Sequence, residues 1–150
     1  MFFGETSINL DAKGRMALPT RYRESVQEAS GNRLVLTYSA FDSGCLWLYP
    51  EPEWARVRDQ VMGLSTFNPS HRGLQRRLVG SATQLELDGS ARLLLPQTLR
   101  QVAGLEKKVV LMGMGARFEV WNENVLNQRR AEEERSIQEQ ASAEMAELVL

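Results

Sequence analysis

Apolar and polar residues alternate along several short stretches of the chain. Ile8 and Leu10 alternate with the polar residues Ser7 and Asn9, and a period of two is typical of a β-strand with one buried face. Clusters of apolar residues predict further short strands at 34–36, 46–49, 85–87, 109–111 and 118–121. The strand pattern dominates the chain, so we expect a β-rich α+β fold.

A helical spacing follows the first predicted strands. Tyr22, Val26 and Ala29 recur at i, i+4 and i+7, which predicts a short helix that buries these three side chains. Pro19 precedes them at a position where its missing N–H costs nothing, because the first turn of a helix leaves its N–H groups unpaired.

An internal repeat organises these elements. The segment 8–23 reads INLDAKGRMALPTRYR and the segment 85–100 reads LELDGSARLLLPQTLR, with six of sixteen positions identical at a shift of 77 residues. The similarity continues from 34–36 to 109–111 and from 46–49 to 118–121. Each copy therefore predicts the same order of strand, tight turn, strand, short helix and two further strands.

A pair of helices connects the two copies, between residues 50 and 80. Pro52 suits the first turn of one helix and Gly63 ends it, while Asn68 caps the next helix ahead of Pro69. Three arginines lie on the outer side of the second helix, where they form either its solvated side or a secondary basic face: Arg72, Arg76 and Arg77.

From Asn122 onward the pattern predicts one long charged helix. Its narrow apolar stripe is suited to docking against a neighbour, and consists of Ile137, Ala141, Met145 and Leu148. The predicted division of the chain is a first module at 5–50, a helical connector at 51–80, a second module at 81–122 and a C-terminal helix at 123–150.

Charge is unevenly distributed, although the net charge is −1. Residues 1–121 hold 15 Lys and Arg against 12 Asp and Glu, a balance of +3. Residues 122–150 hold three Arg against seven Glu, a balance of −4. An acidic tail thus masks a mildly basic body, and such a body is compatible with phosphate contacts.

Other bulk features narrow the class of protein. The single Cys45 allows no intrachain disulfide and suits a reducing cytoplasm. No apolar run reaches the roughly 18 residues of a membrane helix, and the first residues do not read as a secretory signal. The only histidine, His71, has no acid and nucleophile at suggestive spacing. We therefore predict no enzyme, metal site, cofactor or small-molecule substrate.

Each copy carries an Asp-x-x-x-Arg turn, and the first is rich in positive charge. Its Asp carboxylate can accept backbone N–H groups, and Gly14 tolerates a positive φ. The structural interpretation is a hairpin in which Asp11 pairs with Arg15. The functional interpretation is a DNA-reading loop, because Arg can grip guanine O6 and N7 while Lys contacts phosphate. The predicted DNA-binding residues are Asp11, Lys13, Gly14, Arg15, Arg21 and Arg23.

The second turn keeps Asp88 and Arg92 but has Ser90 in place of the lysine and Ala91 in place of the late glycine. We expect Asp88 and Arg92 to be weaker candidates for DNA contact, in a turn that mainly preserves the fold.

These motifs together resemble the MraZ transcriptional regulators, whose chains carry two AbrB-like modules. The likeness runs from Met1-Phe2-x-Gly4 and Asp11-x-Lys13-Gly14-Arg15 through Pro19-x-Arg21-Tyr22-Arg23 and Tyr49-Pro50-x-Pro52-x-Trp54. It continues through Asn68-Pro69 with Arg72, Arg76 and Arg77, then Asp88-x-x-x-Arg92-x-x-x-Pro96 and Glu119-x-Trp121. Ala91 departs from the family pattern, which has glycine there; Gly89 is positioned to relieve the turn.

The resemblance implies swapped-hairpin modules that form a double-psi-like β-barrel. It also implies a cytoplasmic, nucleoid-associated homo-oligomeric ring of eight or twelve subunits that binds direct repeats in double-stranded DNA. Such a ring would repress the cell-division and cell-wall operon that encodes it. Two alternatives stay open: an AbrB-like antitoxin whose C-terminal helix binds a protein partner, and a ring-forming scaffold without DNA affinity.

Overall fold

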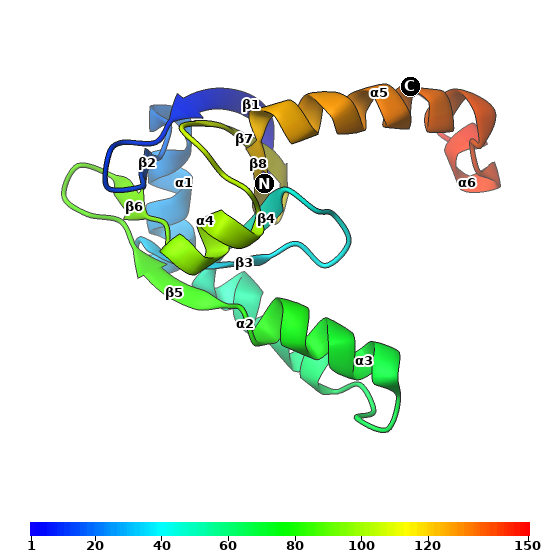
Figure 1. Cartoon of the computed structure of the whole chain (residues 1–150), viewed down its shortest axis with the longest axis horizontal. Helices are drawn as coiled ribbons and strands as arrows, with labels where there is room; N and C mark the ends of the chain where they lie inside the picture. Colours follow the sequence, from blue (N-terminus) through cyan, green and yellow to red (C-terminus); the bar gives the residue numbers. More distant parts are fainter.

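The computed structural model describes residues 1–150 as a strand-rich mixture of α and β structure (Figure 1). The first copy of the repeat comprises β1 (Phe2–Asn9), β2 (Arg15–Ala17), α1 (Thr20–Ser30), β3 (Arg33–Tyr38) and β4 (Cys45–Pro50). The second comprises β5 (Thr83–Glu86), β6 (Arg92–Leu94), α4 (Gln97–Val102), β7 (Lys108–Gly115) and β8 (Arg117–Asn122). The predicted duplication of element order is confirmed.

Strands of the two copies are exchanged. The main sheet is antiparallel with the order β1-β7-β8-β4-β3-β5, so the first strand of each copy pairs with the third strand of the other. The short strands β2 and β6 also pair across the copies, as a two-stranded ribbon. The main sheet is open in this order, with β1 and β5 at its edges.

The exchange produces one shared core. A cluster of 19 buried residues lies between one face of the sheet, the β2–β6 ribbon and helices α1 and α4, and includes Met16, Val26, Leu93 and Phe118. A second cluster of ten buried residues, including Trp47, Tyr49 and Trp121, lies under the connector helices and the start of α5. Burial of β3 and β4 on both faces explains why 34–36 and 46–49 are continuously apolar.

The two connector helices form a hairpin that projects from the body (Figure 1). Helix α2 (Glu51–Met62) ends at Gly63, and α3 (Pro69–Leu74) is capped by the Asn68 side chain, as predicted. A π-helical segment, η1 (Gln75–Val79), follows α3 without a break.

Two expectations about helices are wrong in detail. Ala29 is exposed, and the last buried residue of α1 is Ser30, whose hydroxyl donates to the Val26 carbonyl oxygen. The C-terminal helix is not continuous: α5 (Glu123–Glu139) ends before a new cap at Ser142, which starts the short α6 (Ala143–Ala146). A serine hydroxyl that accepts from a backbone N–H favours such a restart over an uninterrupted helix.

Helix α5 leaves the body after its first turns (Figure 1). Leu126 is its one buried residue, and ion pairs from Arg129 to Asp42 and from Arg130 to Glu5 anchor it. All residues from 131 onward are exposed, including the predicted apolar stripe. None of the helices is both long enough and apolar enough to cross a membrane.

Candidate nucleic-acid interface

The first Asp-x-x-x-Arg turn is held by one carboxylate. Asp11 Oδ1 accepts from the backbone N–H groups of Lys13 and Arg15, both at 2.9 Å. Asp11 Oδ2 accepts from Arg15 Nε at 2.6 Å. The predicted pairing of Asp11 with Arg15 is confirmed, and it leaves the terminal nitrogens of Arg15 free of hydrogen bonds within the chain. The predicted hairpin is wrong, because β1 pairs with β7 and β2 with β6, so the turn joins strands of two different sheets.

The second turn repeats this geometry. Asp88 Oδ1 accepts from the N–H groups of Ser90 at 2.8 Å and Arg92 at 3.0 Å, and Asp88 Oδ2 accepts from Arg92 Nε at 3.1 Å. Ala91 takes a left-handed φ of 57°, where the first turn has Gly14 at 82°. The expectation that Gly89 relieves the turn is therefore wrong: Ala91 itself adopts the conformation that a glycine would adopt more easily.

Hydrogen bonds to the charged form stabilise both carboxylates. The Arg15 backbone N–H, aided by the Arg15 side chain and the Lys13 N–H, lowers the pKa of Asp11 to about 2. The Arg92 backbone N–H is the largest cause of the lowered pKa of Asp88. Both turns thus keep an ionised carboxylate that orients an arginine.

The two arginines share one face of the β2–β6 ribbon. Arg15 pairs with Leu94 and Arg92 with Ala17 in an antiparallel register. Met16 and Leu93, one residue further along each strand, point into the core and are fully buried. Because side chains alternate along a strand, Arg15 and Arg92 both point outward.

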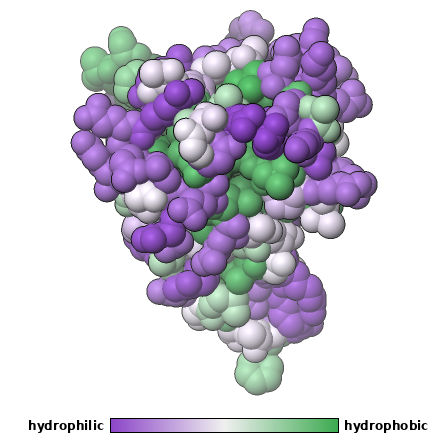
Figure 2. Space-filling model, turned by 90° about the vertical axis from the view of Figure 1, so that its left-hand side faces the viewer, coloured by the Kyte–Doolittle hydropathy of each residue, from purple (hydrophilic) through white to green (hydrophobic).

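Both turns project from the same side of the molecule (Figure 1). The face seen from that side is mostly hydrophilic, with apolar groups showing between the polar side chains (Figure 2). The pseudo-symmetric pair of turns therefore forms one polar surface with two outward arginines at its centre.

Strand exchange also assigns an arginine of each copy to the turn of the other copy. The Gly14 carbonyl oxygen accepts from the Leu95 N–H at 3.1 Å, and Arg100 Nε donates to the Leu95 carbonyl oxygen at 3.0 Å. A Cβ at Gly14 would lie 2.5 Å from the guanidinium carbon of Arg100. Arg100 therefore lies directly against the first turn.

The equivalent contacts place Arg23 on the side of the second turn. The Ala91 carbonyl oxygen accepts from the Leu18 N–H at 2.9 Å, and Arg23 Nε donates to the Leu18 carbonyl oxygen at 2.9 Å. Arg23 was predicted to act with the first turn, and Arg100 was not among the predicted site residues. The identity of Arg23 and Arg100 in the repeat was the available signal, but it did not reveal which turn each residue serves.

A cavity of about 430 Å³ adjoins the first turn, and its lining has two basic and two acidic residues. Its lining consists of Leu10, Asp11, Ala12, Gly14, Arg100, Leu105, Glu106 and Lys107. Lys107 is a second basic residue near the turn that sequence reasoning did not identify.

The remaining predicted basic residues have different surroundings. Lys13 is exposed at the tip of the first turn. Arg21 donates to Thr6 Oγ1 at 2.6 Å and lies over the Tyr22 ring, so it lines the β1 edge of the body.

Two of the three arginines that were predicted to form a secondary basic face on the connector instead make contacts within the chain. Arg77 donates to the Ser39 and Asp42 carbonyl oxygens and lies over the Tyr38 ring. Arg72 donates to the Thr66 carbonyl oxygen at 2.8 Å. Arg76 alone is exposed without an ion pair or side-chain hydrogen bond.

Comparison with known proteins gives consistent matches along the chain. The family model described as "MraZ protein, putative antitoxin-like" matches twice, over residues 1–77 and 78–147. A Stenotrophomonas maltophilia protein named transcriptional regulator MraZ is 58% identical over 123 residues, which is 82% of this chain and 83% of the relative.

Two further relatives with the same name are more distant. The Xylella fastidiosa protein is 52% identical over 123 residues, covering 82% of this chain and 83% of its own length. The Marinobacter nauticus protein is 47% identical over 126 residues, covering 84% of each chain. Both copies of the repeat thus match the family model, and relatives of this identity cover most of the chain: it belongs to the MraZ family.

Proposed function

We propose that this protein is a transcriptional regulator that binds double-stranded DNA through its two Asp-x-x-x-Arg turns and the ribbon between them. The observation that carries the proposal is the pair of outward arginines, Arg15 and Arg92, each held by an ionised carboxylate on one two-stranded ribbon. The major groove of B-DNA admits such a ribbon, and guanine offers two acceptors to a guanidinium. The names of the relatives support regulation of transcription as the purpose of this binding.

The first turn makes the stronger contact in this proposal. Lys13 supplies a charge for a phosphate where the second turn has the neutral Ser90, and Arg100 with Lys107 flanks the first turn. Asp11, Gly14, Arg21 and Arg23 serve the interface by shaping the turns or by facing the DNA backbone, with Asp88 and Arg92 as the weaker second contact.

Assembly completes the proposal. The exchanged copies form one unit, and a homo-oligomeric ring of eight or twelve units presents one DNA-binding surface per subunit to direct repeats upstream of its own cell-division and cell-wall operon. Each surface binds weakly, and the ring gains affinity through effective concentration. The ring then represses transcription in the cytoplasm, on the nucleoid.

A gel shift on the DNA upstream of the gene tests the interface. Arg15→Ala should bind that DNA about 5-fold or more weakly, since one good guanidinium–guanine contact contributes about 1–3 kcal/mol. Arg58→Ala is the matched control, because Arg58 pairs with Asp59 on α2. Equal binding by Arg15→Ala and the native protein at the same salt concentration contradicts the proposal.

The variant Asp11→Asn tests whether Asp11 acts by orienting Arg15 or only through its negative charge. It removes a negative charge, so attraction to phosphate alone predicts tighter binding. Loss of the ion pair that orients Arg15 predicts weaker binding to the specific DNA site, and this is the result that we expect.

Binding of a protein partner through α5 and α6 is a second candidate function. The exposed Ile137, Met145 and Leu148 favour it, because they have no covering partner in the chain. Deleting residues 131–150, which are all exposed, should leave the gel shift unchanged but abolish regulation in cells if this function holds.

A further inference from the structure

One large apolar side chain lies on the outward face of the β2–β6 ribbon. Leu94 is 56% exposed, whereas its neighbours in the chain, Leu93 and Leu95, are fully buried. Because side chains alternate along a strand, Leu94 points away from the core, on the same side of the ribbon as Arg92. A single exposed apolar residue is common on protein surfaces, so the significance of Leu94 depends on what surrounds it.

Leu94 lies directly opposite Arg15 in the ribbon, as its Cα partner in the antiparallel register. The Leu95 N–H donates to the Gly14 carbonyl oxygen at the preceding pair. Hydrogen-bonded pairs alternate with pairs that have no backbone hydrogen bonds, and in the second kind the Cα atoms are only about 4.5 Å apart. The apolar side chain of Leu94 therefore lies next to the guanidinium that Asp11 orients.

The second arginine of the ribbon has a smaller apolar neighbour. Arg92 is the Cα partner of Ala17, which occupies in the first copy the position that Leu94 occupies in the second. Ala17 is also exposed. The outward face of the ribbon thus consists of two arginines, each beside an apolar side chain, and the larger apolar surface lies beside Arg15.

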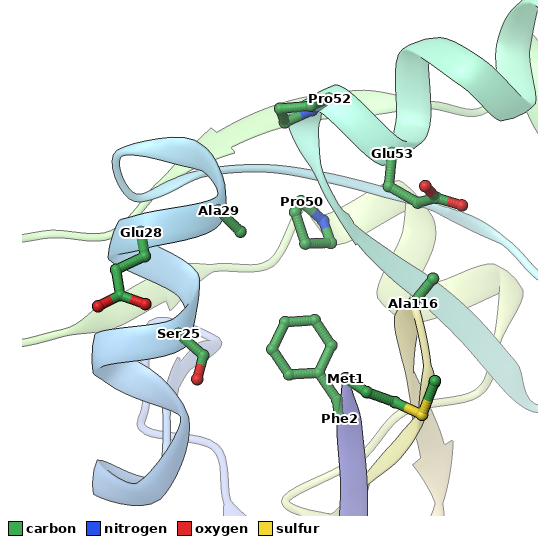
Figure 3. A pocket seen from close by; sticks show the side chains of 10 residues that line it. Met1, Phe2, Ser25, Glu28, Ala29, Pro50, Pro52, Glu53 and Ala116 are labelled. Carbon is green, nitrogen blue, oxygen red and sulfur yellow. The ribbon is translucent and has the colours of Figure 1, made fainter.

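A groove of about 660 Å³ lies elsewhere on the chain, between α1, the β4–α2 corner and the start of β1. Figure 3 shows the ring of Phe2 inside it and the carboxylates of Glu28 and Glu53 on opposite sides. No lysine or arginine lines this groove, so it is not suited to a polyanion such as DNA. Leu94, beside an arginine of the proposed DNA-binding surface, is better placed to meet a base than the apolar lining of the groove.

The chemistry of the major groove identifies the group that Leu94 fits. Each base pair presents hydrogen-bond donors and acceptors there, and thymine adds a methyl group at C5. A guanidinium binds guanine O6 and N7, whereas an aliphatic side chain gains free energy only by covering apolar surface. Successive bases are about 3.4 Å apart along the helix axis, a spacing similar to the roughly 4.5 Å between the Cα atoms of Arg15 and Leu94. The two side chains therefore match two neighbouring base pairs.

We propose that Leu94 contacts the C5 methyl group of a thymine in the base pair next to the guanine that Arg15 contacts. Leu94 is then a specificity-determining residue, and each chain prefers a site in which a guanine and a thymine lie in neighbouring base pairs. The inference rests on the proposed function, because it requires the ribbon to lie in the major groove. It extends that function from the existence of a DNA contact to the bases that are recognised.

Base analogues that remove single groups test this contact with the full-length protein. Uracil replaces each thymine of the upstream DNA in turn, which removes only the methyl group, and 7-deazaguanine replaces each guanine, which removes the N7 acceptor. Fluorescence anisotropy at one salt concentration measures binding. One uracil should weaken binding by the native protein about 3- to 5-fold, the effect of losing one buried methyl group. It should lie next to a guanine whose 7-deaza form also weakens binding.

Variants of Leu94 show whether this residue senses the methyl group. Leu94→Ala should bind the unmodified DNA at least as weakly as the native protein binds the uracil-containing DNA, and uracil should then have no further effect. Leu94→Met keeps an aliphatic contact and should keep the sensitivity to uracil. Met62→Ala is the matched control, because Met62 is 50% exposed on α2, outside the ribbon, and it should bind both DNAs like the native protein. The ribbon already accommodates alanine at the equivalent Ala17, so Leu94→Ala should keep the native circular dichroism spectrum.

Two results would overturn the inference: native binding that no uracil substitution weakens, or a Leu94→Ala variant that keeps the native sensitivity to uracil. A contact between Leu94 and a deoxyribose would give the first result, with Leu94→Ala binding both DNAs equally weakly. Failure of the proposed function is distinguishable, because Arg15→Ala would then bind the unmodified DNA as tightly as the native protein.

Discussion

An acidic side chain at the centre of the proposed DNA-binding surface is electrostatically unfavourable, because it repels phosphate. Asp11 offsets that cost by fixing a neighbour: its carboxylate binds two backbone N–H groups and the Nε of Arg15. A guanidinium held through Nε keeps its terminal nitrogens directed outward and loses less rotamer entropy on binding. The same reasoning applies to Asp88 and Arg92.

Protonation of the Asp11 carboxylate at low pH should break its ion pair with Arg15. The ordinary pKa of the Asp11 carboxyl is 3.8 and the folded protein lowers it to about 2. The contribution of the ionised carboxylate to stability is therefore fully present above about pH 3.8 and is lost as the pH falls through about 2. We expect the Arg15 amide resonance in ¹H–¹⁵N spectra to shift with a midpoint near pH 2, and Asp11→Asn to abolish the shift. A midpoint at or above 3.8 would show that the turn does not hold the carboxylate.

Ala91 is a position where a substitution should increase the stability of the protein. Its left-handed φ of 57° costs an L-residue about 1–2 kcal/mol, while a glycine adds about 0.4–1 kcal/mol of unfolded-state entropy. Ala91→Gly should raise the free energy of unfolding by about 0.5–1 kcal/mol, measured by urea denaturation with an unchanged slope.

Gly89→Ala is the control for that substitution, because Gly89 has no positive φ and an added Cβ there meets nothing within 4 Å. It should leave the stability equal or slightly higher. If Ala91→Gly lowers the stability instead, the left-handed conformation at Ala91 is not strained.

Strand exchange determines which helix supports which turn. The N–H of Leu95, from the second copy, donates to Gly14 of the first, and the equivalent bond runs from Leu18 to Ala91. Helix α4 therefore brings Arg100 to the first turn, and α1 brings Arg23 towards the second. Charge that the sequence concentrates in the first copy is shared between the turns in the folded chain.

Arg100→Ala should consequently weaken DNA binding at least as much as Arg23→Ala does. If each arginine neutralises one phosphate, its loss should reduce the magnitude of the slope of log K against log salt by about 0.9. Fluorescence anisotropy at several salt concentrations measures this slope. Arg33→Ala, which removes an exposed arginine paired with Glu51, is the control and should leave it unchanged. A reduced slope for Arg23→Ala alone would contradict the exchanged assignment.

Sequence patterns predicted the helices, strands and turns better than the pairing of the strands and the contacts between distant side chains. The repeat, the Asp turns and the Asn68 cap depend on neighbours within a few residues, and all were predictable. The pairing of β1 with β7 was not predictable from alternation, because equivalent strands occur in both copies and satisfy the same pattern. Arg77 was misjudged for a similar reason: the Tyr38 ring that it covers is distant in sequence.

At the scale of the whole molecule, neither copy of the repeat has a complete core. Ten of the 19 residues in the shared core belong to residues 1–77 and nine to residues 78–150. Strands β1, β2 and β5 find their hydrogen-bonded partners only in the opposite copy. The family model matches each copy separately, yet the folded unit needs both.

Separate fragments 1–77 and 78–150 should therefore not fold as monomers. Each lacks the partner for its first strand and leaves about half of the shared core uncovered, while isolated strands and small cores are unstable in water. Mixing the fragments should form a 1:1 complex whose ¹H–¹⁵N spectrum resembles that of the intact chain, since all exchanged pairings can form between two chains. A well-dispersed spectrum from monomeric 1–77 alone would mean that the first copy closes on itself, and the exchanged pairing would then be wrong.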